Sequence, residues 1–342
     1  MARVKGLAEA RVAIVGCGLV GNKRARALGD HTLVAAADTD IDRAKRLASA
    51  FPSCKTIETD WRTIVGRDDV DVVIVATTND RLADVTIDAM RHGKHVLVEK
   101  PAARNLAEIQ AVAEFAAESF AVDGVIVKVG FNHRFHPALA KAKEIFDTGT
   151  IGPLMFIRAR YGHGGRLGME KEWRANPAIA GGGEMLDQGV HLIDLSRWFA
   201  GDFTDVRGHV ATFFWDMPVE DNGFACLTTA AGQVAWLHAS CTEWKNLFSF
   251  EIYGKTGKLQ IEGLGGSYGV ERLSHYQMLP QMGPPETTIY EYPGEDRSWH
   301  AEWEHFMTCI DQRRQPSGNL DDAAAAMRVI DALYHQARGQ RS

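Results

Sequence analysis

The sequence predicts an α/β protein with two domains, and three observations support this fold class. The chain has 342 residues, more than the roughly 250–300 at which a single hydrophobic core usually stops growing. Residues 11–128 alternate short apolar segments with helix-like ones, which is typical of a parallel sheet with helical crossovers. Residues 206–264 contain half-alternating segments between glycine or acidic turns, which indicate an antiparallel sheet. We therefore expect domains at residues 1–128 and 129–342.

The first domain is predicted to alternate strand and helix throughout. Pro52 would end the second helix and Gly93 would close the third. The expected strands are residues 11–15, 33–37, 70–76, 95–98 and 125–129, and the expected helices are 22–28, 40–51, 83–92 and 106–118.

The second domain is predicted to begin with a helix and then to consist mainly of strands. Their density favours an antiparallel arrangement. A final helix is expected at residues 321–337, with Asn319 as its N-terminal cap. The other elements are a helix at 137–148 and strands at 154–161, 206–215, 223–230, 234–241, 248–253 and 258–262.

The first 38 residues contain the parts of a dinucleotide-binding site in register. A glycine-rich turn follows the first strand at once, and an acid, Asp38, ends the second strand 22 positions after Gly16. Gly16 would permit the tight turn, Gly18 would let the backbone approach a pyrophosphate, and Gly21 would let the helix pack on the strand. The helix N-terminus would bind the phosphates, and the acid would meet the ribose hydroxyls.

Composition and charge exclude several other classes of protein. The chain is 45% hydrophobic and 24% charged, and its net charge of −6 gives no reason to expect nucleic acid or an anionic membrane as a partner. Apolar segments are too short to span a bilayer, and the N-terminus lacks a signal-like apolar core. Five cysteines are scattered without CxxC spacing, which predicts reduced thiols in a cytoplasmic protein, not disulfides or a zinc site.

Four segments give the chain a family resemblance: Gly16–Gly21, Glu99-Lys100-Pro101, Gly130-Phe-Asn-His-Arg134 and Gly181–His191. With them the chain resembles the glucose–fructose oxidoreductase / inositol dehydrogenase (Gfo/Idh/MocA) family. The resemblance implies a Rossmann dinucleotide-binding domain, then an α/β domain with a large, mostly antiparallel open sheet that often forms the subunit interface. It also implies a nicotinamide cofactor, a sugar, cyclitol or nucleotide-sugar substrate, and a homodimer or homotetramer. One departure is the stretch 22–24, where many relatives place a histidine.

Three residues are predicted to be catalytic. Lys100 lies at the carboxyl end of a strand, where open α/β sheets bind their ligands. Asp187, His191 and Asp194 have the spacing of one helical stripe, so Asp187 could hold the His191 imidazole in one tautomer. His191 would take a hydroxyl proton while Lys100 stabilises the oxyanion, or the two would exchange roles if burial lowers the lysine pKa. The alternatives are a buried histidine with an acid partner and a metal site; we expect no metal.

The remaining candidate residues come largely from the resemblance. A structural role explains Asn132, Arg134, Trp173 and Arg174 equally well. The predicted cofactor contacts are Gly16, Gly18, Leu19, Val20, Gly21, Asp38, Thr77, Asn79 and Glu99, and the predicted substrate contacts are Lys100, Asn132, Arg134, Trp173, Arg174, Asp187 and His191.

The leading prediction is an NAD(P)-dependent sugar or cyclitol dehydrogenase. Asp38 would repel the 2′-phosphate of NADP, so NAD is favoured, and only Arg43 could compensate. The alternatives are a glycoside hydrolase or epimerase-like enzyme that oxidises a sugar transiently, and a cofactor-sensing regulator. A basic cluster, His163, Arg166, Lys171 and Arg174, suggests an anionic substrate, although the interleaved Glu170 and Glu172 equally fit a loop of mixed charge.

Overall fold

The computed structural model describes residues 9–339, and these divide into two compact units. The first unit contains the chain up to Phe131 together with Trp299–Ala324, and the second contains Asn132–Ser298 together with the residues from Ala325 onward. The first crossing lies close to the boundary predicted near residue 128. The return of 299–324 to the first unit differs from the predicted domains.

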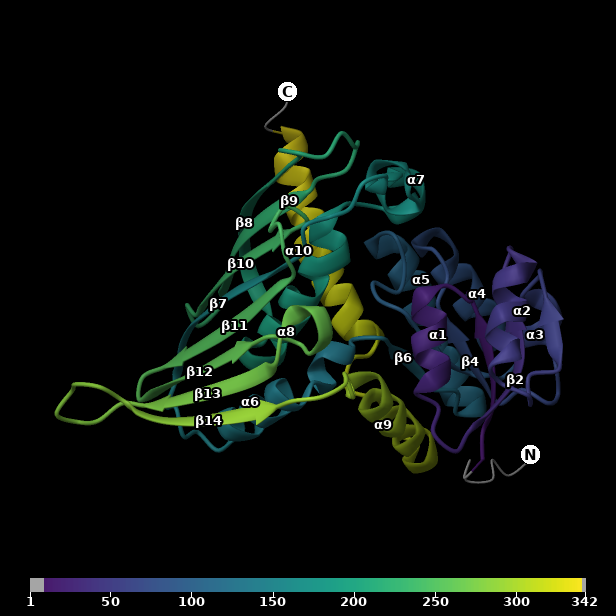
Figure 1. Ribbon diagram of the computed structural model, residues 1–342, viewed down its shortest axis with the longest axis horizontal. Helices are drawn as coiled ribbons and strands as arrows, with labels where there is room; N and C mark the ends of the chain where they lie inside the picture. Colours follow the sequence, from purple (N-terminus) through teal and green to yellow (C-terminus); the bar gives the residue numbers. More distant parts are fainter. Residues whose placement is uncertain (1–8, 340–342) are drawn as a thin grey trace. The chain divides into compact units, whose positions relative to one another are not determined.

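The first unit is built on a six-stranded sheet in the order β3-β2-β1-β4-β5-β6, drawn in purple and blue in Figure 1. Every neighbouring pair in this sheet is parallel. This is the strand order of dinucleotide-binding doubly wound sheets. The strands are β1 (Arg11–Val15), β2 (Thr32–Ala37), β3 (Thr56–Glu58), β4 (Val72–Val75), β5 (His95–Val98) and β6 (Val127–Val129).

Helices connect these strands, and α9, from the C-terminal part of the chain, packs into the same core. Trp303, Phe306 and Ile310 of α9 are buried with Leu28 and Ile126, which explains why α9 belongs to the first unit. Neither α9 nor the short strand β3 was predicted from the sequence. The helices are α1 (Leu19–Arg26), α2 (Ile41–Ser49), α3 (Arg62–Val65), α4 (Asn79–Arg91), α5 (Leu106–Asp123) and α9 (Ser298–Gln312).

The second unit is built on an eight-stranded sheet in the order β14-β13-β12-β11-β7-β10-β9-β8. Only the β7–β10 pair is parallel among the described strands of this sheet, so the expected mostly antiparallel sheet is confirmed. The strands are β7 (Leu154–Gly162), β8 (Phe203–Ala211), β9 (Asn222–Thr229), β10 (Val234–Ser240), β11 (Leu247–Gly254), β12 (Gly257–Glu262), β13 (Glu271–Gln277) and β14 (Glu286–Tyr292).

Helices of the second unit lie on one face of this sheet (Figure 1). Asn319 caps α10 as predicted, because its side-chain oxygen accepts the Asp322 N–H at 3.0 Å. The helices are α6 (Pro137–Asp147), α7 (Pro177–Ala180), α8 (Val190–Ala200) and α10 (Leu320–Gly339), of which the first residues belong to the first unit. Single turns are η1 (Asn132–Phe135), η2 (Met169–Lys171), η3 (Trp173–Ala175), the π-helical η4 (Met185–Gly189) and η5 (Gly266–Tyr268).

Candidate functional site

The glycine turn of the first unit leaves open space at the start of α1. A Cβ atom at Gly16, where φ is +95°, would lie 2.3 Å from a backbone carbonyl oxygen, and one at Gly21 would lie 2.0 Å from the Gly16 carbonyl oxygen. A Cβ at Gly18 would meet no described atom within 4 Å. Leu19 and Val20 open the helix there, and Leu19 is 77% exposed. The turn therefore fits a phosphate bound by the backbone N–H groups of a helix N-terminus.

Asp38 is anchored to this turn. Its carboxylate accepts the backbone N–H of Cys17 at 2.8 Å and that of Asp40 at 2.9 Å. Burial, together with the Asp38 charge, raises the pKa of the Cys17 thiol to about 12, so the thiol stays protonated. Arg43, the cation considered for NADP, forms a surface ion pair with Asp40 at 3.4 Å. The acid thus lies beside the turn, where dinucleotide-binding sites hold the adenosine ribose.

The loops after β4 and β5 carry the other candidate residues of the first unit. Thr77 follows β4, and its hydroxyl donates to the Thr78 carbonyl at 3.1 Å. Asn79 is the first residue of α4, which begins four residues earlier than predicted. Lys100 follows β5, and its peptide bond to Pro101 is cis. These loops lie at the carboxyl edge of the sheet, where open parallel sheets bind their ligands.

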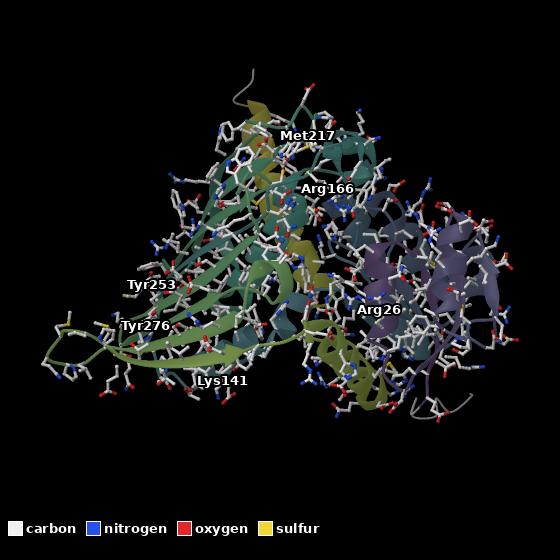
Figure 2. All side chains as sticks on the ribbon, viewed as in Figure 1. Arg26, Lys141, Arg166, Met217, Tyr253 and Tyr276 are labelled. Carbon is white, nitrogen blue, oxygen red and sulfur yellow. The ribbon has the colours of Figure 1, made fainter. Side chains whose placement is uncertain are left out.

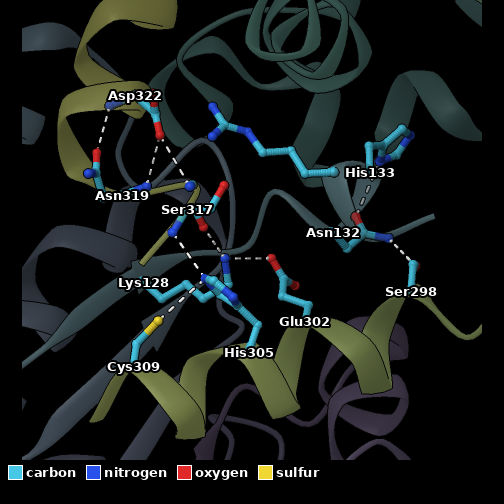
Figure 3. Close-up of polar contacts among 12 residues, drawn as sticks. Lys128, Asn132, His133, Ser298, Glu302, His305, Cys309, Ser317, Asn319 and Asp322 are labelled. Carbon is cyan, nitrogen blue, oxygen red and sulfur yellow. Dashed lines mark hydrogen bonds and ion pairs between the residues drawn. The ribbon is translucent and has the colours of Figure 1, made fainter. Parts of the chain in front are cut away.

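Glu99 is engaged inside the protein. It is 7% exposed and accepts Arg24 Nε–H at 2.6 Å. Arg24 Nη1 also donates to Glu302 at 2.6 Å. Lys128 Nζ lies 3.3 Å from the other Glu302 oxygen (Figure 3). Burial raises the pKa of Glu99, against the effect of Arg24. The Glu99 side chain therefore belongs to a buried ion-pair network, and the cofactor contact at this residue stays a prediction.

In the second unit the π-helical turn η4 contains Asp187 and leads directly into α8, the helix that contains His191. Glu220 anchors the start of this turn, since its carboxylate accepts the N–H groups of Gly183 at 3.0 Å and Met185 at 3.1 Å. The hydroxyl of Tyr334 donates to the same carboxylate at 2.7 Å. Because the turn is π-helical, the residues do not follow the regular α-helical stripe assumed from the sequence. Such π turns are frequent at functional sites.

The glycines before this turn serve protein packing. A Cβ at Gly182 would lie 2.1 Å from the Tyr334 hydroxyl, and one at Gly183 would lie 2.1 Å from the Glu220 carbonyl oxygen. Gly181 has a φ of +86° at the end of α7. The absence of side chains at Gly182 and Gly183 therefore makes room for neighbouring protein atoms.

Asp187 is bound by a predicted substrate residue. Arg174 Nε donates to its carboxylate at 3.1 Å, with both side chains partly exposed. The Arg174 guanidinium also lies over the ring of Trp173, 4.4 Å from its centroid. These three residues therefore form one contiguous group. Arg166 (labelled in Figure 2) pairs with Glu172 at 2.5 Å, which favours the loop of mixed charge over an anion-binding cluster.

His191 lies in a buried aromatic group. It is 4% exposed, and its ring stacks on that of His133 with the centroids 3.8 Å apart and the planes 25° apart. The Tyr161 ring centroid is 5.1 Å from that of His133 and 6.1 Å from that of His191. Burial raises the pKa of Tyr161 well above its ordinary value, so this phenol stays neutral.

Two further predicted substrate residues have buried protein partners. Arg134 donates to both carboxylate oxygens of Asp194 at 2.8 and 2.5 Å, and the two residues are 6% and 1% exposed. Asn132 is 5% exposed and donates to the Ser298 hydroxyl at 2.9 Å. This geometry supports the structural explanation for both residues, which the sequence had left open.

Sequence reasoning missed three residues that shape this region: His133, Glu184 and Glu220. Glu184 is 3% exposed and lies 3.6 Å from Nε2 of His163, whose Nδ1 accepts the Gly165 N–H at 3.0 Å. The position of His133 inside the Gly130–Arg134 motif was the one available signal. Glu220 precedes a strand in a segment without periodicity, so its burial was not visible from the sequence.

Two features are absent from the described residues 9–339. No group of three or more histidine, cysteine, aspartate or glutamate side chains there could hold a metal ion. No helix in that range is both long and apolar enough to cross a bilayer. All five cysteines have free thiols.

Two family models match consecutive parts of the chain. Residues 10–131 match the oxidoreductase family with an NAD-binding Rossmann fold, and residues 139–260 match the GFO/IDH/MocA C-terminal domain. The matched regions coincide with the six-stranded sheet and with most of the eight-stranded sheet.

Curated relatives and solved structures agree with these matches. Levoglucosan dehydrogenase of Pseudarthrobacter phenanthrenivorans is 33% identical over 51% of this chain and 44% of its own length. The scyllo-inositol 2-dehydrogenase (NAD(+)) of Bacillus subtilis is 27% identical over 94% of this chain and 92% of its own. The dTDP-3,4-didehydro-2,6-dideoxy-alpha-D-glucose 3-reductase of Actinomadura kijaniata is 30% identical over 73% of both chains. A solved levoglucosan dehydrogenase complex with NADH and levoglucosan has a TM-score of 0.87, 23% identity, and coverage of 97% of this chain and 98% of that one.

Proposed function

We propose that this chain, which belongs to the GFO/IDH/MocA family of NAD-binding oxidoreductases, oxidises a secondary alcohol of a sugar, cyclitol or nucleotide sugar to a ketone or catalyses the reverse reduction. The observation that carries the proposal is the glycine turn, where Gly16 and Gly21 are packed and Gly18 faces open space beside Asp38. That arrangement fits a dinucleotide with its pyrophosphate on α1. Relatives named for inositol and levoglucosan support the substrate class.

The nicotinamide, when bound, supplies the hydride acceptor or donor. The chain must then move one proton and stabilise one oxyanion. We assign the proton transfer to His191 and the oxyanion contact to the Lys100 ammonium, with the exchange of these two roles as the alternative. Asp187 holds Arg174 at 3.1 Å, so the pair can bind substrate hydroxyls through a carboxylate and a guanidinium. Thr77 and Asn79 are assigned to the cofactor.

Alanine variants test these catalytic assignments. Lys100→Ala and His191→Ala should each reduce turnover by about 100- to 10,000-fold, as loss of a general acid or base does, while NADH affinity is largely retained. Turnover of inositols and levoglucosan, followed through NADH absorbance, provides the assay. Near-normal turnover in either variant would refute the corresponding role. Net NADH formation from a free sugar also separates a dehydrogenase from an enzyme that oxidises its sugar only transiently.

We also infer a preference for NAD(H) over NADP(H). Asp38 faces the position of the adenosine ribose, and its negative charge would meet the 2′-phosphate of NADP. Arg43 pairs with Asp40 on the surface, so it is not directed to that phosphate. The repulsion is worth about 1–3 kcal/mol, or roughly ten- to a hundredfold in affinity. Dissociation constants that are equal for NADH and NADPH would contradict this, and Asp38→Ala should narrow the difference.

The uncovered face of the eight-stranded sheet supports a homo-oligomer. Phe156 and Tyr253 stack there with ring centroids 4.3 Å apart, and Trp236 is 54% exposed. Lys258 Nζ lies 4.8 Å from the ring centroid of Tyr253 and 5.5 Å from that of Tyr276 (both tyrosines labelled in Figure 2). A broad aromatic face of this kind marks an interaction surface. We propose that two copies pair through it; Trp236→Glu should then lower the mass measured by light scattering, and an unchanged mass would refute the proposal.

We further propose a cytoplasmic location. All five cysteines are free thiols. Free thiols persist in a reducing compartment. Fractionation of the source cells with an antibody against the chain tests this location.

A further inference from the structure

The ring of His133 lies directly against the ring of His191. The two imidazoles stack at 3.8 Å, although they come from different segments, η1 and α8. Both are about 95% buried, with exposures of 5% and 4%. Two buried rings at van der Waals separation restrict each other's orientation, because neither can rotate without displacing the other.

A chain of hydrogen bonds fixes which nitrogen of His133 carries a proton. Ser298 Oγ lies 2.6 Å from an Asp296 carboxylate oxygen, which can only accept, so the serine hydroxyl donates to it. Asn132 must therefore donate its amide N–H to Ser298 Oγ at 2.9 Å and turn its oxygen to His133. His133 Nδ1 lies 3.2 Å from that oxygen and must be the donor (Figure 3). An uncharged His133 in this chain of hydrogen bonds is therefore the Nδ1–H tautomer.

Other ionisable groups surround the pair from several elements. Tyr161 on β7 and Tyr268 on η5 interact by a hydrogen bond, and burial raises the pKa of Tyr268 to about 12. The carboxylates of Asp187 and Glu184 act on both phenols. His136, 5.5 Å from His133 between ring centroids, is held by Glu271 at 3.0 Å, and it lies 3.8 Å from Asp296. Both phenols are neutral, and the carboxylates Glu271 and Asp296 lie beside His136.

We propose that His133 is a positioning residue for His191. Its uncharged ring, held as the Nδ1–H tautomer by Asn132, Ser298 and Asp296, provides a flat face that keeps the His191 ring in one orientation before and after proton transfer. The proposal rests on the function assigned to His191 above. Orientation matters because a displacement of about 1 Å in a reacting group can cost on the order of a hundredfold in rate.

Two substitutions at His133 separate the flat face from the hydrogen-bonding nitrogen. His133→Phe keeps an aromatic face, whereas His133→Leu keeps apolar volume without one. We expect His133→Leu to lower kcat by about 10- to 100-fold and His133→Phe to stay within roughly threefold of the parent. Equal losses in the two variants, or no loss in either, would overturn the stacking role.

Nitrogen NMR of the full-length, histidine-labelled protein tests the charge and the tautomer without any substrate. We expect His133 as the Nδ1–H tautomer and a His191 pKa that moves by less than about half a unit in His133→Phe. A cationic His133 would repel a proton on His191, so its removal would raise that pKa by about three units at an effective dielectric of 20. Such a rise, or the Nε2–H tautomer, would overturn the proposal. The NMR measurement tests the stacking of His133 on His191 even if His191→Ala retains turnover. Retained turnover in His191→Ala would refute the catalytic role proposed for His191, not the stacking.

Breaking the series of hydrogen bonds that ends at His133 provides the last comparison. Ser298→Ala should give His133 a mixture of tautomers and lower kcat by about 3- to 10-fold. The matched control is Ser196→Ala on α8, a buried serine whose hydroxyl makes no hydrogen bond with the described residues. The control should change neither the tautomer nor kcat. If Ser298→Ala and Ser196→Ala had the same effect on the His133 tautomer and on kcat, the hydrogen bonds of Asn132, Ser298 and Asp296 would have no part in positioning His133.

Discussion

Removing one carboxylate from the buried ion-pair network of the first unit should destabilise the protein strongly. Arg24 and Lys128 face Glu99 and Glu302, and the side chains of Arg24, Lys128 and Glu302 are at most 1% exposed. The two positive and two negative charges balance. Glu302→Gln leaves two cations beside one carboxylate, out of reach of water. Breaking a buried pair in this way typically costs about 3–5 kcal/mol.

A double-mutant cycle separates this electrostatic effect from lost packing. Arg24→Met should cost a similar amount because it leaves Glu99 and Glu302 with Lys128 alone. The double variant Arg24→Met/Glu302→Gln restores balance, so its cost should fall below the sum by about 0.5–3 kcal/mol. Urea unfolding followed by tryptophan fluorescence, at one pH and one protein concentration, gives the free energies. Because Glu99 directly precedes Lys100, Arg24→Met should also lower turnover.

The control is an arginine paired at the surface. Arg207 donates to Asp205 at 2.9 Å, and their side chains are 78% and 51% exposed. Such pairs contribute about 0–1 kcal/mol, so Arg207→Met should change stability by less than about 0.5 kcal/mol. The reasoning fails if Glu302→Gln costs no more than Arg207→Met, or if the costs of Arg24→Met and Glu302→Gln simply add.

Three further outcomes follow from buried groups. Burial lowers the pKa of His95 to about 4, while the unfolded chain takes up this proton near pH 6.5. Stability should therefore be full above about pH 6.5 and fall by up to about 3 kcal/mol toward pH 4, with a flatter profile in His95→Gln by urea unfolding. Glu220→Gln, which replaces one acceptor oxygen beside Gly183 and Met185 with a donor, should cost about 1–3 kcal/mol in the same assay; no change would refute its anchoring role. Gly130→Ala should lower the melting temperature, because its Cβ would lie 2.6 Å from Arg24 Nη2, and an unchanged value would contradict this geometry.

The sequence predicted those parts of the fold that depend on local pattern. The strand, glycine turn and acid at residues 11–38 lie together at one edge of the parallel sheet, and Asn319 caps α10 as expected. It did not predict β14, because residues 286–292 are mostly exposed and polar and pair at the edge of the sheet. It also missed α9, which has a regular apolar face but packs with a unit whose preceding segment ends at Phe131. Local pattern gives the type of an element and not the core that it joins.

The charged residues of the candidate site show the same limit of prediction from local sequence pattern. The spacing predicted Asp187 and His191 in one helical segment. In the structure a π turn held by Glu220 contains Asp187, and the sequence periodicity does not indicate this turn. The partners of the charged residues are still further away in sequence. Arg134 and Asp194 are 60 residues apart, and Arg24 and Glu302 are 278 apart. A basic residue in a motif can therefore bind a ligand or pair with an acidic residue far away in the sequence. The sequence does not distinguish these two roles.

These pairings bear on the charge of the substrate. Arg166 and Arg174, which suggested an anionic substrate, are bound to Glu172 and Asp187 at 2.5 and 3.1 Å. An anion at Arg174 would have to displace Asp187 and would face its carboxylate, whereas a polyol can accept from the guanidinium and donate to the carboxylate together. We therefore predict that kcat/KM for inositols and anhydrosugars exceeds that for uronates and nucleotide sugars by tenfold or more, about 1.4 kcal/mol. Arg174→Lys should lower kcat/KM for the neutral substrates, since a lysine lacks the planar fork. Efficient turnover of uronates with inositols inert would show that Arg174 leaves Asp187 when substrate binds.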